Sequence, residues 1–127
     1  WASFPILSWR AKLPLDISTT AGFNQFANEV KDILDTQFAS AKLDALVNNA
    51  GIGINQSFET TTEETLDTMT NIHFKGPYFL TQKLLPLLND GSSIVNTSSG
   101  LARFSFAGYS CVVIVKLGIP HPLFIIF

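Results

Sequence analysis

The apolar positions in the first half of the chain follow two different spacings. Between Phe23 and Phe38 they recur every three or four residues, which predicts an amphipathic helix with a polar outer face. Hydroxyl residues at positions 18–20 are expected to cap its free N–H groups. Residues 43–47 then form a short apolar run that stops at two Asn, an Ala and a Gly, which predicts a buried parallel strand with a polar end.

A long apolar face of helical spacing follows over residues 63–88, beginning at a threonine and two glutamates that suit a helix start. Gly76-Pro77 is expected to bend or divide this helix, because proline lacks a backbone donor. Residues 89–91, Asn-Asp-Gly, predict a turn. Residues 93–96 predict a second short strand.

Strands that alternate with helices predict an α/β fold, with right-handed crossovers and a doubly wound parallel sheet in three α/β/α layers. Ligands bind such folds at the carboxyl ends of the strands, so the polar segment after residues 43–47 is the expected crevice. A chain of 127 residues has room for one domain, 1–127. Because it opens on Trp1 and carries eleven Phe, we expect an incomplete domain whose apolar surface belongs against something else.

Charge and cysteine content restrict the partners. The net charge is −2, and the eight Lys and Arg residues form no cluster, so neither nucleic acid nor a membrane is an expected partner. The single Cys111 allows no internal disulfide and suits a reducing, cytoplasmic location, where it is expected to be a small buried hydrophobe. His73 and His121 lack the spacing of metal ligands, so we expect no metal site and a core or surface role for both.

Three polar motifs give this chain a family resemblance. Asn-Asn-Ala-Gly at 48–51 after a buried strand, Asn71 in the long helix, and Asn-Thr-Ser-Ser-Gly at 96–100 after the next strand together resemble the short-chain dehydrogenases/reductases. Members of this family are Rossmann-fold enzymes that move a hydride between NAD or NADP and a carbonyl or alcohol. The resemblance implies a partial Rossmann-like sheet without its first and C-terminal strands, and residues 1–12 and 111–127 do not match it.

The resemblance also implies a cofactor site. Asp16 corresponds to the acid that accepts a hydrogen bond from the adenine amino group, and Ile17 shares that contact through its backbone. Asn48, Ala50 and Gly51 correspond to the stretch where backbone approaches the cofactor, with the glycine leaving space that a Cβ would fill. The alternatives are an ordinary turn aspartate and a generic turn at a strand end.

The implied catalytic residues are incomplete. Ser99 matches the serine that binds the substrate oxygen, and Asn71 the asparagine that kinks the helix and holds a water; a cap or turn role is the alternative for both. Lys116 matches the lysine that holds the nicotinamide ribose and lowers the pKa of a catalytic tyrosine, unless this match is a coincidence. That tyrosine belongs at position 112, where Val112 has no proton to give, and Tyr109 lies three residues early.

The resemblance is lost at both ends of the matching region. Residues 111–115 form a β-branched run that is not expected to be helical. The abrupt change suggests a reading-frame slip or a splice error near Ser110. No counterpart of the family's Gly-rich phosphate loop precedes Asp16. We therefore expect this chain to be an inactive piece of an oxidoreductase acting on a small carbonyl or alcohol.

A non-catalytic segment that docks on a full-length relative is the alternative function. The helix over residues 63–88 is its expected contact, and a homo-oligomer is possible through the same helix. In the Rossmann strand order 3-2-1-4-5-6, the strand at 43–47 is the fourth and would lie beside the missing first strand. Its bare edge leads us to expect that the isolated chain is poorly stable or aggregates.

Overall fold

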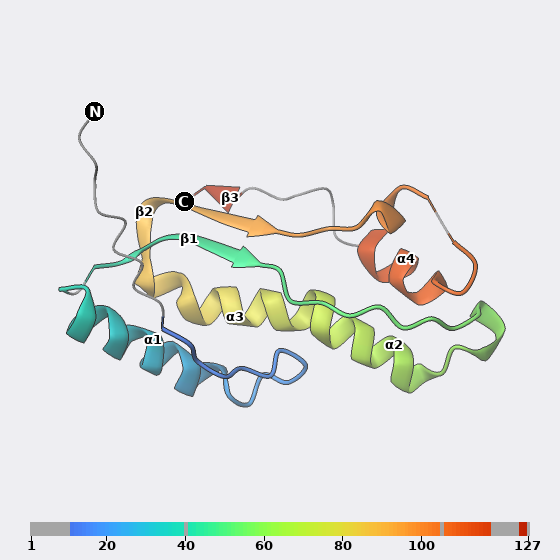
Figure 1. The fold of residues 1–127 in the computed structure, drawn as a ribbon, viewed down its shortest axis with the longest axis horizontal. Coiled ribbons are helices and arrows are strands. Elements are labelled where there is room, and N and C mark those ends of the chain that lie inside the picture. The colour runs from blue at the N-terminus through green and yellow to red at the C-terminus, as the bar shows by residue number, and fades with distance from the viewer. Residues whose placement is uncertain (1–10, 40, 105, 118–124, 127) are drawn as a thin grey trace.

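The fold is a short sheet with a layer of helices along it (Figure 1). The computed structural model describes residues 11–39, 41–104, 106–117 and 125–126. In chain order the elements are α1 (Phe23–Gln37), β1 (Leu43–Asn48), η1 (Phe58–Thr60), α2 (Glu63–Thr70), the π-helical turn η2 (Asn71–Lys75), α3 (Gly76–Leu84), η3 (Leu85–Leu87), β2 (Leu88–Asn96), η4 (Gly100–Ala102), α4 (Ser110–Leu117) and β3 (Ile125–Ile126).

The sheet has the order β1-β2-β3. β1 and β2 are parallel, as predicted, with Leu46 opposite Ile94 and Asn48 opposite Asn96. The short β3 pairs with β2 in the antiparallel direction, which the expected parallel sheet did not include. The expectation that this strand is buried was wrong for the described structure, because none of the residues of β1 is buried and Val47 is 59% exposed. Within the described ranges no strand pairs with the other edge of β1. The bare edge expected for this strand is therefore present.

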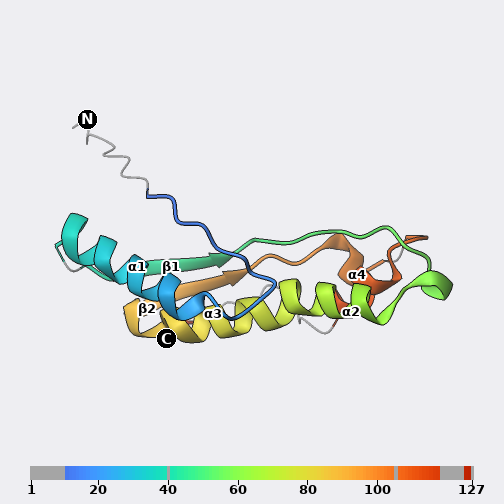
Figure 2. The ribbon, with the colours of Figure 1, turned by 90° about the horizontal axis from the view of Figure 1, so that it is seen from below.

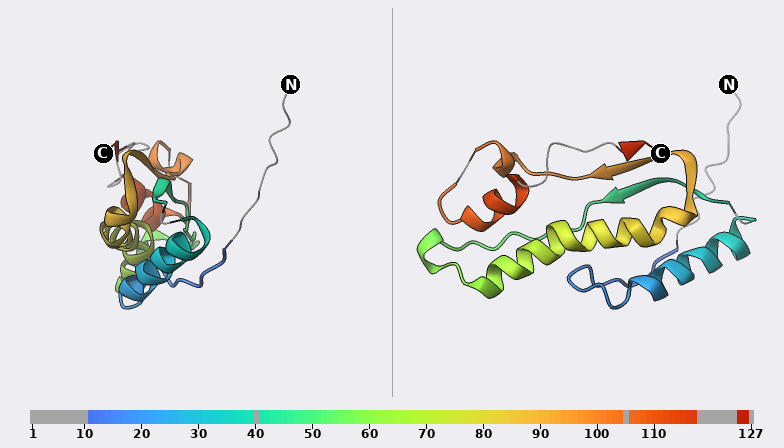
Figure 3. Two further views of the ribbon diagram at one scale, coloured as in Figure 1. Left: turned by 90° about the vertical axis from the view of Figure 1, so that its left-hand side faces the viewer. Right: turned by 180° about the vertical axis from the view of Figure 1, so that it is seen from behind.

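The helices α1 and α3 lie side by side on one face of the strand pair (Figures 1 and 2). Phe23 of α1 packs with Leu80 and Leu84 of α3, and Leu46 of β1 contacts this cluster. Side chains alternate across a strand, so Val47 points to the opposite face. Two of the three expected layers are thus seen in the described part of the chain, as the end-on view in Figure 3 shows.

The helix α4 overturns one sequence-based expectation. We expected the β-branched run at 111–115 to be unhelical, yet these residues lie inside Ser110–Leu117, a helix that packs against α2 (Figure 3). Cys111, Val112 and Val115 occupy one side of α4 and form a buried cluster with Met69. Helix propensity is a weak preference, and burial of this apolar side against α2 overrides it.

The long helical region is divided, as expected, and the division takes the form of a π turn. The N–H of Gly76 donates to the carbonyl of Asn71, five residues earlier, rather than four as in an α-helix. Pro77 follows directly and has no N–H to donate, which favours an irregularity at this point. The expected start is also confirmed, because the Thr62 hydroxyl accepts from the N–H of Thr65 at 3.2 Å.

Two local predictions were wrong. The N-cap of α1 is Gly22 and makes no side-chain cap, so the hydroxyls at 18–20 do not cap the helix. Residues 89–91 lie inside β2 rather than in a turn between elements. Gly91 has φ of +79°, and the register between β1 and β2 shifts nearby, so the Asn-Asp-Gly sequence produces an irregularity within the strand.

Candidate functional site

Asn48 joins the carboxyl ends of both parallel strands to the helical layer. Its side-chain Nδ2 donates to Oδ1 of Asn96 at 2.8 Å and to Oγ1 of Thr81 at 3.1 Å. Its backbone carbonyl accepts from the N–H of Thr97 at 3.1 Å and from the hydroxyl of Thr97 at 3.2 Å. These hydrogen bonds of the Asn48 side chain and backbone carbonyl therefore fix the position of the carboxyl end of β1 relative to β2 and α3.

The segment that follows β1 is exposed above a buried histidine. Asn49, Ala50, Gly51 and Ile52 are all exposed, so their backbone is open to a ligand. A Cβ on Gly51 would lie 2.7 Å from Cε1 of His73, which leaves no room for a side chain on that side. The resemblance assigned the space at Gly51 to a cofactor, and in this structure the neighbour of Gly51 on this side is the imidazole of His73.

His73 is the functional candidate that sequence reasoning missed. We expected a core or surface role, and its side chain, 6% exposed, does lie in the core. In addition, its Nε2 lies 2.7 Å from the backbone carbonyl of Ile52, so the imidazole reaches the segment after β1. One signal was available: His73 is four residues after Met69 on the apolar side of the helix, where a polar residue needs a partner.

Asp16 and Ile17 lie in the loop before α1. Oδ1 of Asp16 accepts from the N–H of Ser18 at 2.9 Å and from its hydroxyl at 2.7 Å, and these hydrogen bonds lower the pKa of the carboxyl. This local arrangement is the turn that we considered as the alternative role of Asp16. The backbone of Ile17 packs closely on Gly76, at the end of the π turn, which brings this loop to the helix that carries Asn71.

Ser99 and Asn71 are not joined by a hydrogen bond in the described structure. The hydroxyl of Ser99 accepts from the N–H of Leu101 at 3.2 Å and so caps η4. Asn71 begins the π turn, where its carbonyl accepts from Gly76. Both residues therefore have local structural roles, and the helix irregularity implied for Asn71 does occur at that residue.

At position 112, where the family resemblance places the catalytic tyrosine, this chain has a residue of the core. Val112 is 4% exposed and packs with Met69, so the side chain at this position is part of the core. Tyr109 precedes α4 and also packs against this cluster. Lys116 lies in α4, one helical turn after Val112, but its side chain is outside the described part of the structure.

The loops that follow β1 and β2 meet beyond the strand ends. The N–H of Gln56 donates to the carbonyl of Gly108 at 2.7 Å, and Gln56 forms a parallel bridge with Tyr109. Phe104 and Phe106 contact each other edge to face, at 5.7 Å between ring centroids, and both are exposed. The loop after β1 and the loop after β2 are therefore joined by backbone contacts at Gln56.

A family model for enoyl-(acyl carrier protein) reductases matches residues 7–121. The chain belongs to the short-chain dehydrogenase/reductase family. The matched range begins within residues 1–12 and extends past residue 111 into α4, so it is longer than the region in which the sequence motifs showed the resemblance.

Two curated members of the family are 28% and 33% identical to this chain over the residues that align. An NADPH-dependent aldehyde reductase of Arabidopsis thaliana chloroplasts is 33% identical over 96 residues, which cover 70% of this chain and 31% of that protein. A 3-oxoacyl-(acyl carrier protein) reductase of Thermotoga maritima is 28% identical over 95 residues, covering 72% and 39%. This chain therefore spans only 31–39% of the length of these relatives.

Solved family members confirm the partial Rossmann-like fold. A landomycin C-6 ketoreductase with bound NADP and rabelomycin superposes with a TM-score of 0.75 at 28% identity, over 82% of this chain and 42% of that one. A short-chain dehydrogenase from Streptomyces avermitilis gives 0.70 at 34% identity, over 84% and 38%. The described fold thus corresponds to about two fifths of a solved family member.

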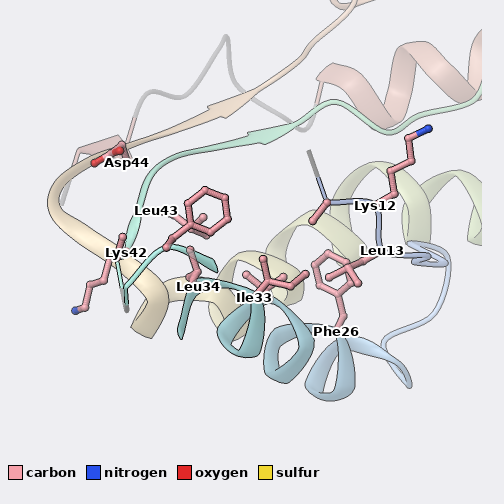
Figure 4. Close-up of a pocket in the computed structure, with 12 residues that line it drawn as sticks. Lys12, Leu13, Phe26, Ile33, Leu34, Lys42, Leu43 and Asp44 are labelled. Carbon is pink, nitrogen blue, oxygen red and sulfur yellow. The ribbon is translucent and has the colours of Figure 1, made fainter. Parts of the chain in front are cut away.

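An apolar groove of about 820 Å³ lies away from the family's motifs (Figure 4). Phe26, Ile33 and Leu34 of α1 form one side, and Leu43 marks its position at the amino end of β1. None of the described side chains that the resemblance assigns to the site lines it. The groove therefore lies beside the start of β1, whereas Asn48, Ala50 and Gly51 lie at its carboxyl end. None of the described helices is both long enough and apolar enough to span a membrane.

Proposed function

We propose that this chain forms the central part of the nucleotide site of an NAD(P)-dependent oxidoreductase, and that alone it does not catalyse hydride transfer. The observation that carries this proposal is the position of Asn48, which ties the carboxyl ends of β1 and β2 together beside an exposed backbone segment. In open parallel sheets this edge is where ligands bind.

The described residues fit part of a dinucleotide. The exposed backbone at Ala50 and Gly51 would lie against the cofactor at the strand end, held in place by Asn48. Asp16 and Ile17 would contact the adenine, and the packing of Ile17 on Gly76 holds that loop to the helical layer. A bound NAD(P) would supply or accept the hydride. The NADP in solved relatives supports this cofactor class.

The chemistry toward the substrate is incomplete in this chain. Ser99 would bind the oxygen of a small carbonyl or alcohol, Asn71 would hold a water through the π turn, and Lys116 would hold the ribose. Reduction of a carbonyl leaves an alkoxide that needs a proton. Val112 is buried in the core and carries no proton to give, so we expect cofactor binding without turnover. The proposal includes a cytoplasmic location, which suits a chain whose single cysteine, Cys111, is buried.

A fluorescence titration with NADPH, together with an assay of NADPH oxidation in the presence of a small aldehyde, tests this proposal. We expect saturable binding that is weakened in Asn48→Ala, whereas Asn24→Ala, on the exposed side of α1, binds normally. Neither the wild-type chain nor the two variants should oxidise NADPH. The proposal is wrong if the wild-type chain binds no nicotinamide nucleotide, and the inactive state is wrong if it turns the aldehyde over.

A second function, docking on another copy of the family fold, is favoured by an exposed apolar stripe on the long helix. Phe74 and Tyr78 are 53% and 62% exposed and lie four residues apart, and Leu85 continues the same side at its carboxyl end. The extra residue of the π turn brings Leu66 of α2 onto this side as well. An apolar stripe of this kind suits a helix-to-helix contact, in a homo-oligomer or with a full-length relative.

Sedimentation of the purified chain tests the docking function. We expect Phe74→Ser combined with Tyr78→Ser to shift the chain toward monomer, while Gln82→Ser, at an exposed polar position of α3, leaves association unchanged. If the double variant sediments like the wild type, the stripe is not the contact.

A further inference from the structure

His73 makes a contact between two segments that are far apart in sequence. It lies in the π turn between α2 and α3, and its Nε2 is 2.7 Å from the carbonyl oxygen of Ile52, twenty-one residues earlier. The same imidazole lies against Gly51, where a Cβ would come within 2.7 Å of Cε1. One buried ring therefore contacts both residues that follow Ala50.

The short distance to an acceptor identifies the protonated nitrogen. A carbonyl oxygen only accepts, so a contact of 2.7 Å requires Nε2 to carry a hydrogen and donate it. The N–H of Ile52 lies 3.4 Å from the same nitrogen, which is a weaker approach. The hydrogen bond thus has a defined direction, from the helix to the loop.

We propose that His73 is the positioning residue that sets the loop at 50–53 for cofactor binding, by donating from Nε2 to Ile52 and by supporting Gly51 from below. This inference rests on the proposed function, because it assigns the loop to the cofactor. Asn71, the residue of the same turn that the resemblance singles out, has no described side-chain hydrogen bond to this loop.

The geometry explains why the irregular turn matters. Residues of a π turn have an altered angular position around the helix, because one extra residue is inserted. This insertion lies at Asn71–Lys75, the segment that contains His73, and Gly76 closes it against the backbone of Ile17. The loop after β1 and the loop before α1 are therefore held by the same turn of helix.

Two substitutions separate the hydrogen bond from the ring contact. His73→Phe keeps a planar ring against Gly51 and removes the donor, whereas His73→Gln keeps an N–H donor at a similar reach. Ile72→Val is the matched control, since Ile72 is also buried in the π turn and makes no described contact with the loop. Backbone ¹⁵N relaxation of Gly51, Ile52 and Gly53 is measured without cofactor, and the NADPH dissociation constant is measured separately.

We expect His73→Phe to lower the order parameters of these loop amides from rigid values near ~0.85 toward ~0.6. NADPH binding should weaken about fivefold, the effect of losing one hydrogen bond. His73→Gln and Ile72→Val should both stay close to wild type, and the wild-type imidazole ¹⁵N shifts should report a proton on Nε2.

Unchanged loop order in His73→Phe, or equal loss in His73→Gln, overturns the inference. These outcomes are independent of the cofactor. If His73→Phe shows the expected loss of loop order but the wild-type chain binds no NADPH, His73 anchors the loop and the proposed function is contradicted instead.

Discussion

Replacing Gly76 by alanine should destabilise the fold, although the same change stabilises most helices. In an ordinary helix interior, Gly→Ala is worth about 0.5–1 kcal/mol in favour of alanine. At Gly76 a Cβ would lie 2.3 Å from the carbonyl oxygen of Ile17 and 2.9 Å from that of Asn71. Both atoms belong to the backbone, so neither can rotate away, and one of the two segments must move.

The net effect follows from these opposing contributions. Overpacking in a well-packed region costs about 1–3 kcal/mol, and two rigid backbone contacts place Gly76 toward the upper end of that range. Subtracting the helix gain leaves a net loss of roughly 1–2 kcal/mol. With a urea m-value of about 2 kcal/mol/M, the midpoint should fall by roughly 0.5–1 M.

Urea unfolding followed by circular dichroism measures this shift, with a stabilising osmolyte added if the chain is only marginally folded. Gly22→Ala is the control, because no atom lies within 4 Å of its Cβ position and its φ is −87°. Its midpoint should change little. The combination of Gly76→Ala with Ile17→Ala should recover only part of the loss, since the nearest atom is a backbone oxygen that the second change retains.

A raised midpoint in Gly76→Ala would refute the reasoning. It would mean that the backbone of Ile17 does not rest on the helix, and that the loop with Asp16 is not held to the π turn. A full recovery by Ile17→Ala would locate the clash in the side chain, at the Cγ1 contact of 2.8 Å, rather than in the backbone.

Three further predictions concern the site. Gly51→Ala should lower the urea midpoint by the equivalent of about 1–3 kcal/mol, because its Cβ would clash with the imidazole of His73. In a double-mutant cycle, His73→Ala should largely abolish this loss, since it removes the ring that the Cβ would meet. Additive effects of the two changes would contradict the contact between Gly51 and His73. Val112→Tyr should lower the thermal midpoint, because it forces a larger side chain into the cluster around Met69. It should not produce NADPH-dependent aldehyde reduction, and turnover by this single variant would contradict the expectation that more than the tyrosine separates this chain from an active enzyme. Ser18→Ala should raise the pKa of Asp16 toward its ordinary value, since the serine hydroxyl and N–H are what lower it; an NMR titration of the carboxyl carbon that finds no change would contradict this turn. The stabilisation from this turn is present above the unfolded pKa of Asp16 and is lost as the pH falls through the lowered, folded value.

The elements with a strong local signal could be predicted from the sequence. The apolar spacing from Phe23 onward predicted α1, which spans Phe23–Gln37. The apolar run ending at Asn48 predicted β1, which spans Leu43–Asn48. In α1 the spacing of apolar residues also determines which side is buried, so no knowledge of distant residues is needed. In β1 the same local reasoning gave the strand but not its burial, since none of its residues is buried and burial depends on which elements cover the two faces.

The failures involve contacts between distant residues. The run at 111–115 is helical because Met69, more than forty residues earlier, gives its apolar side a place to pack. The expectation of an extended segment rested on local propensity alone, which such packing readily reverses. The turn expected at 89–91 failed for a similar reason, since pairing with β1 continues the strand through an irregularity at Gly91.

The role of the glycine after Asn-Asn-Ala shows the limit most clearly. The sequence required space at Gly51, and the family resemblance attributed that space to an approaching cofactor. In the fold, His73 already occupies the space on one side of Gly51. A glycine requirement is therefore visible in a sequence, whereas the group that imposes it depends on which distant side chain the fold places there.

The two core clusters explain why the π turn at Asn71–Lys75 can position both the loop after β1 and the loop before α1. One cluster joins α1 and α3 through Phe23 and Leu84, and the other joins α2 and α4 through Met69 and Val112. Each cluster fixes its own end of the long helical region, and the π turn at Asn71–Lys75 lies between them. His73 and Gly76 contact the loops after β1 and before α1 from this junction. A change in how the two clusters are oriented would therefore move both loops together, so the site depends on the junction and not on either cluster alone.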